Sequence, residues 1–149
     1  HHTSIWNGLD DIKVLVHMPP EGDYNSNATP YAFEKTYQKY KEKQVSDIAL
    51  MSFGIGDGGG GPGEYHINMA KRCENLRYIP NVKMSSSEKF FNELKKDISN
   101  YPEYKGELYL AHIPHRARSK RTTENASVCF ILPSGFVPWH ICKVKPIRI

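Results

Sequence analysis

The length and composition of the chain place it among ordinary globular domains. It has 149 residues, of which 39% are hydrophobic and 24% charged, and its formal net charge is +4. This length is enough for one domain with a core, and the composition is ordinary for a globular protein. No apolar run approaches the roughly 18–20 residues of a membrane span, and so mild a charge does not by itself indicate nucleic acid. We therefore expect neither a membrane nor a nucleic-acid partner.

The cysteines and the N-terminus indicate in which compartment the protein is found and whether it is processed. Cys73, Cys129 and Cys142 are too few and too irregularly spaced for a disulfide framework, and they favour a reducing compartment. The sequence starts without Met and without the basic flank and apolar core of a signal peptide. We therefore expect a processed protein or a piece of a longer one.

The first half of the chain predicts two strands with a helix between them. Residues 12–17 (IKVLVH) are rich in β-branched side chains and predict a buried strand. Thr29 is suited to cap a helix whose first residue is Pro30, and helical spacing continues over residues 31–43. Residues 47–53 (DIALMSF) predict the second strand, and a glycine-rich run follows it directly.

Two further strand and helix pairs are predicted downstream. Pro62 suits the first position of a helix that continues over residues 63–76, and residues 79–84 predict a third strand. Ser85 to Ser87, followed by Glu88, are typical of the start of a third helix over residues 87–98. One face of that helix carries three apolar residues expected in the core: Phe90, Phe91 and Leu94. Residues 106–110 (GELYL) predict a fourth strand.

The predicted order βαβαβαβ is typical of an α/β fold with a mostly parallel sheet flanked by helices. Ligands of such sheets bind beyond the carboxyl ends of the strands. The glycine-rich run leaves the carboxyl end of the second strand, so we expect function there. After residue 110 the pattern degrades, and we leave residues 122–149 without a predicted structure.

The run FGIGDGGGGPG, residues 53–63, admits three interpretations. A flexible linker is disfavoured because the run joins an apolar strand directly to an amphipathic helix. A phosphate cradle at a helix N-terminus is possible in principle, but the lysine and hydroxyl of a P-loop are missing and Asp57 would repel the anion. In the third interpretation, Asp57 acts as acid or base while glycine backbone approaches a neutral ligand closely.

Other polar candidates have simpler explanations. His17 ends an apolar strand, so we expect a hydrogen-bonded core histidine rather than a metal ligand. A separate zinc site is disfavoured because its pairs lie far apart in sequence; its members would be His112, His115, His140 and Cys142. The basic stretch 115–121 lacks interleaved aromatic residues and is expected to be a solvated face.

Several motifs together resemble one enzyme family. FGIGDGGGGPG is similar to the loop F-G-x-G-D-G-G-G-G-P-T of the family 38 glycoside hydrolases, the α-mannosidases, especially their cytosolic and microbial branch. The N-terminal stretch HTSIWNGLDDIKVLVHMPPEGDYNS resembles F-W-W-x-G-[IL]-D-G-x-x-V-L-x-H-x-P-P-x-x-x-Y-N. YKGELYLA resembles W-x-G-E-L-Y-L-E, and RSKR resembles a basic stretch downstream. The resemblance covers about residues 1–121 and implies a cytoplasmic location.

The resemblance implies that residues 1–121 are part of a catalytic α/β domain and that residues 122–149 are a divergent tail. The family hydrolyses terminal α-mannosyl residues with retention, which requires two carboxyl groups roughly 5–5.5 Å apart. It also implies a zinc cofactor whose ligands lie outside this chain, so no metal ligand is expected here. The expected partners are a mannose-containing oligosaccharide and the remainder of the catalytic domain.

The matching positions carry the expected site. Asp57 falls where the family has its acid/base loop, and Gly58, Gly59, Gly60 and Gly61 would line the sugar subsite. Glu107 and Tyr109 match the G-E-L-Y-L motif and are expected to bind substrate. The chain departs from the family pattern at three positions: Asp11 for Gly, Gly63 for Thr and Ala111 for Glu.

Two other functional classes stay open at this point. The chain could be a non-catalytic carbohydrate- or protein-binding remnant of the fold, or an anion-binding α/β domain that uses the glycine loop. A chain of only these residues is expected to be inactive alone. It is also expected to be poorly soluble, because a truncated sheet exposes an edge strand.

Overall fold

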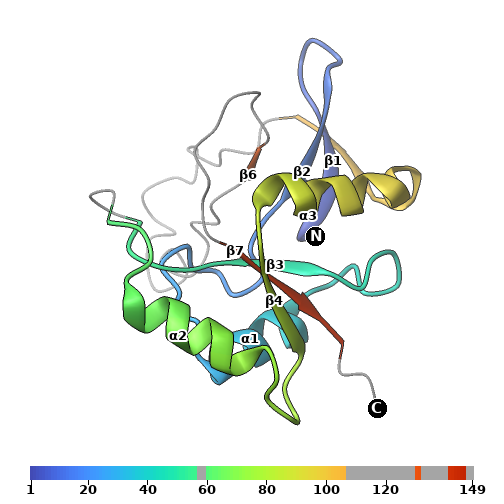
Figure 1. Cartoon of the computed structure of the whole chain (residues 1–149). Coiled ribbons are helices and arrows are strands. Elements are labelled where there is room, and N and C mark those ends of the chain that lie inside the picture. The colour runs from blue at the N-terminus through green and yellow to red at the C-terminus, as the bar shows by residue number, and fades with distance from the viewer. Residues whose placement is uncertain (57–59, 107–129, 132–140, 147–149) are drawn as a thin grey trace, which may run out of the picture.

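The computed structural model describes residues 1–56, 60–106, 130–131 and 141–146, which form two small sheets and three α-helices (Figure 1). The strand order is β5-β1-β2-β6 in the first sheet and β3-β7-β4 in the second. The α/β class expected from the sequence is therefore present. None of the helices in the described residues is long and apolar enough to cross a membrane.

The first sheet is built on a hairpin. β1 (Thr3–Asn7) pairs antiparallel with β2 (Lys13–His17). In the turn between them, Asp10 Oδ1 accepts from the Ile12 N–H at 3.2 Å. β5 (Glu103–Lys105) pairs parallel with β1, and β6 (Phe130–Ile131) pairs antiparallel with β2.

The second sheet has a strand from the C-terminal part of the chain at its centre. β7 (Ile141–Lys145) lies between β3 (Ala49–Ser52) and β4 (Asn81–Ser85) and runs antiparallel to both (Figure 1). β3 and β4 consequently run in the same direction, as strands joined by a helical crossover do. The inserted strand separates them.

The helices α1 and α3 begin at polar caps, as the sequence indicates. α1 (Pro30–Lys39) starts after Thr29, whose hydroxyl accepts from the Ala32 N–H at 3.3 Å. α3 (Ser87–Leu94) starts after Ser86, which accepts from the Lys89 N–H at 3.4 Å. A 3₁₀ segment, η2 (Lys95–Asn100), continues α3.

The start of α2 differs from the prediction. α2 (Glu64–Cys73) begins two residues after Pro62, with Gly63 as its N-cap, so the expectation of Pro62 at the first helical position is wrong. Gly63 has extended backbone at this cap, and the His66 ring reaches back to accept its N–H.

The core has two parts, one on each face of the second sheet. Alternation along the strands sends Met51, Cys142 and Val144 to the face covered by α1 and α2. Leu50 and Ile141 face the other way, toward α3 and the first sheet. The residues predicted for the core of the third helix are buried there: Phe90, Phe91 and Leu94.

The expectation of one mostly parallel sheet is not confirmed. Among the strand pairings of the two described sheets, β1 with β5 is parallel and the other four are antiparallel. The predicted strands at 12–17, 47–53 and 79–84 correspond to β2, β3 and β4. The hairpin partner β1 and the tail strands β6 and β7 were not predicted, and they supply the antiparallel pairings. The expected strand over residues 106–110 lies outside the described residues after Gly106.

Candidate active site

The glycine loop leaves β3 and returns to α2, and its two arms are held together at their base. The Ile55 N–H donates to the Gly61 carbonyl and the Gly61 N–H donates to the Ile55 carbonyl, each at 2.8 Å. This pair of bonds forms an isolated antiparallel bridge. Asp57, Gly58 and Gly59 lie between the bridged residues in sequence and are outside the described residues.

The outgoing arm of the loop rests on residues 24–26. The Gly54 N–H donates to the Ser26 carbonyl at 3.0 Å, and the Gly56 N–H donates to Asn25 Oδ1 at 2.5 Å. Below them, the Ser52 hydroxyl donates to the Tyr24 carbonyl at 3.2 Å. These bonds fix where the chain enters the enclosed turn. Asn25 is thus a positioning residue for the loop.

Two glycines of the outgoing arm lie where there is no room for a Cβ atom. A Cβ at Gly54, whose φ is +107°, would lie 2.6 Å from the Pro62 nitrogen, and a Cβ at Gly56 would lie 2.5 Å from Asn25 Oδ1. A Cβ at Gly54 would require the backbone of Gly61 and Pro62 to move, and a Cβ at Gly56 would displace the side chains of Asn25 and Tyr24. Here glycine serves the close packing of the loop base rather than flexibility.

The glycines of the return arm have a different setting. A Cβ at Gly61 would meet nothing within 4 Å, and the requirement there is its φ of +61°. Gly60 is exposed, and a Cβ on it would lie 3.2 Å from the Ile55 side chain. Of the predicted sugar-lining glycines, these two are described. Their open backbone is compatible with a closely approaching ligand.

The first turn of α2 follows the return arm of the glycine loop and lies beside it. His66 Nδ1 accepts from the Gly63 N–H at 3.2 Å, and the rings of Tyr65 and His66 meet edge to face with centroids 5.7 Å apart. Tyr65 is 57% exposed. Sequence reasoning gave neither residue a role, although their position directly after the loop was a usable signal. It gave Asn25 no role either, although Tyr24 and Asn25 belong to the N-terminal motif.

A carboxyl group lies close in sequence to the segment that supports the loop. Glu21 is buried, and its Oε2 has no hydrogen-bond partner among the described residues. Burial raises the pKa of this carboxyl, while a hydrogen bond from Ser26 and the charge of Lys35 oppose the rise. Ser26 also accepts the Gly54 N–H, so one residue joins the Glu21 carboxyl to the loop base.

A buried polar cluster elsewhere surrounds His17 and confirms that it is a core histidine. His17 is fully buried; its Nε2 accepts from the Leu50 N–H at 3.2 Å and its Nδ1 lies 2.8 Å from Thr3 Oγ1. Because Nε2 accepts, the ring proton is on Nδ1 and is donated to Thr3. Burial, with a smaller effect of His2, lowers the pKa of His17 to about 3.

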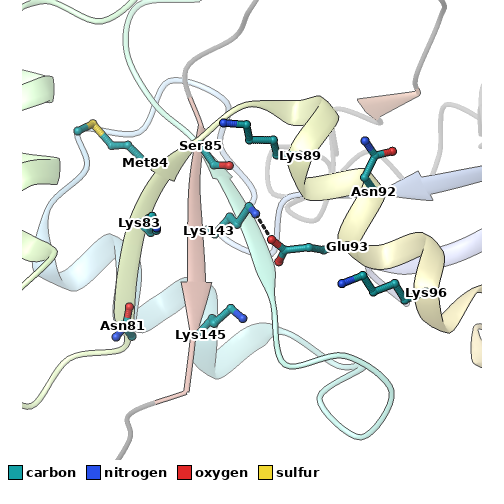
Figure 2. A pocket seen from close by; sticks show the side chains of 10 residues that line it. All are labelled: Asn81, Lys83, Met84, Ser85, Lys89, Asn92, Glu93, Lys96, Lys143 and Lys145. Carbon is teal, nitrogen blue, oxygen red and sulfur yellow. Dashed lines mark hydrogen bonds and ion pairs between the residues drawn. The ribbon is translucent and has the colours of Figure 1, made fainter.

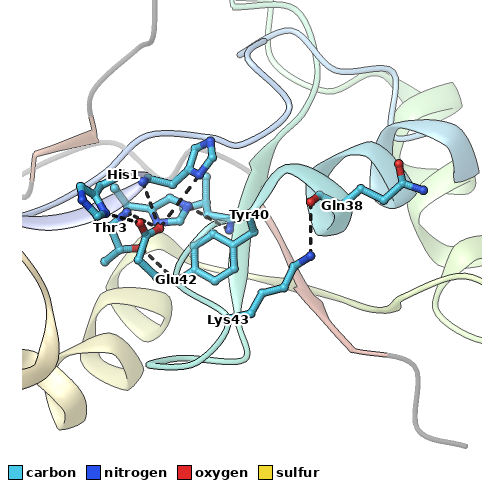
Figure 3. Close-up of polar contacts among 9 residues, drawn as sticks. His1, Thr3, Gln38, Tyr40, Glu42 and Lys43 are labelled. Carbon is cyan, nitrogen blue, oxygen red and sulfur yellow. Dashed lines mark hydrogen bonds and ion pairs between the residues drawn. The ribbon is translucent and has the colours of Figure 1, made fainter.

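The same cluster ties the N-terminal strand to the end of α1 (Figure 3). Glu42 is buried and accepts from the backbone N–H groups of His2 and Thr3, at 3.0 and 3.1 Å, and pairs with the His1 ring at 2.9 Å. The Thr3 hydroxyl also lies 3.0 Å from the Tyr40 hydroxyl. Every contact of the cluster has a structural role: it joins β1, β2, β3 and the segment after α1.

Most of the remaining predicted site residues lie outside the described part of the chain. Glu107 and Tyr109 lie outside the described residues, as do His112, His115 and His140. Cys142 is buried in the centre of β7, where burial raises the pKa of its thiol. Within the described part of the chain, no group of three or more His, Cys, Asp or Glu side chains is placed to hold a metal ion.

The chain belongs to glycoside hydrolase family 38. Residues 1–107 match the N-terminal domain of the glycosyl hydrolases of this family. The chain is 36% identical over 110 residues to alpha-mannosidase 2C1 of Homo sapiens, which covers 74% of this chain and 11% of that protein. It is 31% identical over 127 residues to alpha-mannosidase G of Dictyostelium discoideum, covering 85% of this chain and 12% of that protein.

Alpha-mannosidase of Saccharomyces cerevisiae is 29% identical over 118 residues, covering 73% of this chain and 11% of that protein. The chain thus spans about a ninth of the length of the curated relatives it matches. The resemblance inferred from the sequence motifs is confirmed at the level of the family.

Proposed function

We propose that this chain forms part of the catalytic domain of an α-mannosidase that hydrolyses terminal α-mannosyl residues with retention of configuration. The observation that carries the proposal is the glycine loop of a family 38 domain held rigidly at its base by residues 24–26. The proposed substrate is a mannose-containing oligosaccharide, and the proposed partner is the remainder of the domain.

In this proposal Asp57 is the acid/base residue. Its carboxyl group would donate a proton to the glycosidic oxygen as the leaving group departs, and would then take a proton from the water that releases mannose. The backbone of Gly58 to Gly61 would line the sugar, and Glu107 and Tyr109 would contact its hydroxyl groups. The second carboxyl group that retention requires would come from the rest of the domain.

The proposal places zinc outside this chain. Zinc in a catalytic site takes three protein ligands of the His, Asp, Glu or Cys type, and the family resemblance implies that these ligands lie outside this chain. When bound in the complete domain, zinc would supply Lewis-acid chemistry. The residues of this chain would position the loop and move the proton.

The test compares the gene product that contains this chain with its Asp57→Asn variant on an aryl α-mannoside. The proposal expects the variant to lose activity by roughly the 10²–10⁴-fold that an acid/base residue contributes. Asp97→Asn, in η2, is the matched control and should retain activity. An Asp57→Asn enzyme as active as the control would overturn the assignment, and NMR detection of the first-formed anomer tests retention separately.

Two alternatives give different results in the same experiment. A non-catalytic remnant would leave the wild-type product inert on the mannoside. An anion-binding domain would bind phosphate at the loop and bind it more tightly after Asp57→Asn, because a repelling charge is removed. We also propose a cytoplasmic location, which the free, buried thiols of Cys73 and Cys142 support.

A further inference from the structure

A basic pocket lies on the opposite side of the second sheet from α1 and α2. It has a volume of about 560 Å³ and opens between the strands β4 and β7 and the helix α3 (Figure 2). Its charged lining consists of five lysines and one glutamate: Lys83, Lys89, Lys96, Lys143, Lys145 and Glu93. This volume is in the usual range of small-molecule sites, roughly 300–1,000 Å³.

The secondary structure explains how five lysines reach one pocket. Residues two apart on a strand share a face, which brings Lys143 and Lys145 of β7 to the same side as Lys83 of β4. On the helix, Lys89, Glu93 and Lys96 are separated by four and three residues, so they lie along one stripe. The side chains from the sheet and from the helix therefore face each other across the pocket (Figure 2).

The pocket concentrates the charge of the molecule. Five lysines and one glutamate give it a net charge of +4, which equals the formal net charge of the entire chain. Basic and acidic residues elsewhere in the chain therefore balance. A positive charge gathered in one concave site, instead of being spread over the surface, favours binding of an anion there.

The single glutamate is already engaged. Lys143, 10% exposed in its side chain, pairs with Glu93 across the floor of the pocket. The hydrogen bond from Lys143, followed by the charges of Lys143, Lys145 and Lys96, lowers the pKa of Glu93. Glu93 is therefore a carboxylate that fixes Lys143. Among the described residues, Lys83, Lys89 and Lys96 form no ion pair and are available to a ligand. At the rim, Asp47 lies 3.9 Å from Lys145 Nζ and is 59% exposed, so water screens this contact.

We propose that this pocket binds a small ligand that carries two phosphate groups. A phosphate group has a charge of about −1.5 to −2 at neutral pH, so two of them balance a net charge of +4. Lysine binds phosphate as a point charge on a flexible stem, and the lysines from β4, β7, α3 and η2 would surround the ligand on several sides. The site is separate from the glycine loop and does not depend on the proposed glycosidase activity.

The test is a titration of the gene product that contains this chain with sodium pyrophosphate, at a constant ionic strength where the Debye length is about 8 Å. Calorimetry should report one saturable site, and amide hydrogen exchange should slow on binding at residues 81–85, 89–96 and 141–145. The double variant Lys83→Glu/Lys89→Glu should bind about tenfold more weakly or worse, because two attractive charges become repulsive.

The matched control is Lys39→Glu/Lys71→Glu, which makes the same change in net charge at exposed lysines of α1 and α2. This control should bind pyrophosphate nearly as well as the wild type. Equal weakening in the two double variants would overturn the proposal, since only bulk charge would then matter. So would sulfate or single phosphate binding as tightly as pyrophosphate. Lys83→Gln/Lys89→Gln, with a smaller charge change, repeats the comparison if the glutamate variant no longer unfolds cooperatively.

Discussion

Acid should destabilise this protein through His17. The ring is fully buried and neutral, and its unprotonated Nε2 accepts the Leu50 N–H. A second ring proton, on Nε2, would place two N–H donors against each other in a fully buried site. The pKa of His17 is accordingly lowered from 6.5 to about 3 in the folded state. The unfolded chain therefore binds more protons than the folded one between these two pH values, and the free energy of unfolding falls as the pH falls from about 6.5 toward 3.

The size of the effect follows from proton linkage. At pH 5, 1.5 units below the unfolded pKa of 6.5, the unfolded histidine is almost fully protonated and the folded one is not. The loss in unfolding free energy relative to pH above 7 is then roughly 2 kcal/mol. For a chain of this length, that corresponds to a Tm lower by roughly 4–8 °C.

The assay is chemical and thermal unfolding of the chain at pH 7.5 and pH 5, compared with His17→Gln. Glutamine keeps an acceptor for the Leu50 N–H but does not titrate, so the variant should lose about 2 kcal/mol less than the wild type over this interval. The variant's lower absolute stability does not matter, because each protein is compared with itself. The same pH dependence in both proteins, or an NMR titration of the His17 ring near pH 6.5, would refute the reasoning.

Two further substitutions test the loop base and the inserted strand. Gly56→Ala should cost about 1–3 kcal/mol of unfolding free energy, as overpacking does, because the added Cβ would lie 2.5 Å from Asn25 Oδ1. Gly63→Ala, whose Cβ would be 3.7 Å from the nearest atom, should cost less, because only the poorer N-cap preference of alanine opposes it; equal losses would contradict the described packing. Val144→Ala should cost about 2–3 kcal/mol by lost burial and a residual cavity, because Val144 is 1% exposed between α1 and the sheet. Val14→Ala, at a half-buried site of β2, should cost clearly less in the same denaturant melts. A larger loss for Val14→Ala than for Val144→Ala would contradict the placement of β7 in the core.

Local chemistry made parts of this fold predictable from the sequence. The hydroxyls of Thr29 and Ser86 cap the helices that they were expected to cap. The apolar face of the third helix is buried as its spacing indicated. These features depend on residues within one or two turns of each other, so a single segment contains the information.

Features that depend on distant partners were not predictable. β1 (TSIWN) has no regular alternation and is defined by pairing with β2 and β5. β7 comes from a stretch interrupted by prolines, and nothing local shows that it would lie between β3 and β4. The basic pocket combines lysines from three segments that are far apart in sequence. The positioning role of Asn25 likewise depends on a contact with Gly56, 31 residues away.

The central place of β7 has a consequence for how the chain folds during synthesis. β3 and β4 each hydrogen-bond to β7 and not to each other. The ribosome makes β7 more than fifty residues after β4, so for several seconds both finished strands have unpaired edges. The yield of native protein should therefore depend on the translation speed through residues 86–140. It should also depend on any chaperone that binds β3 and β4 before β7 is made. Slower elongation over this interval would prolong the time in which two exposed strand edges can pair with other chains.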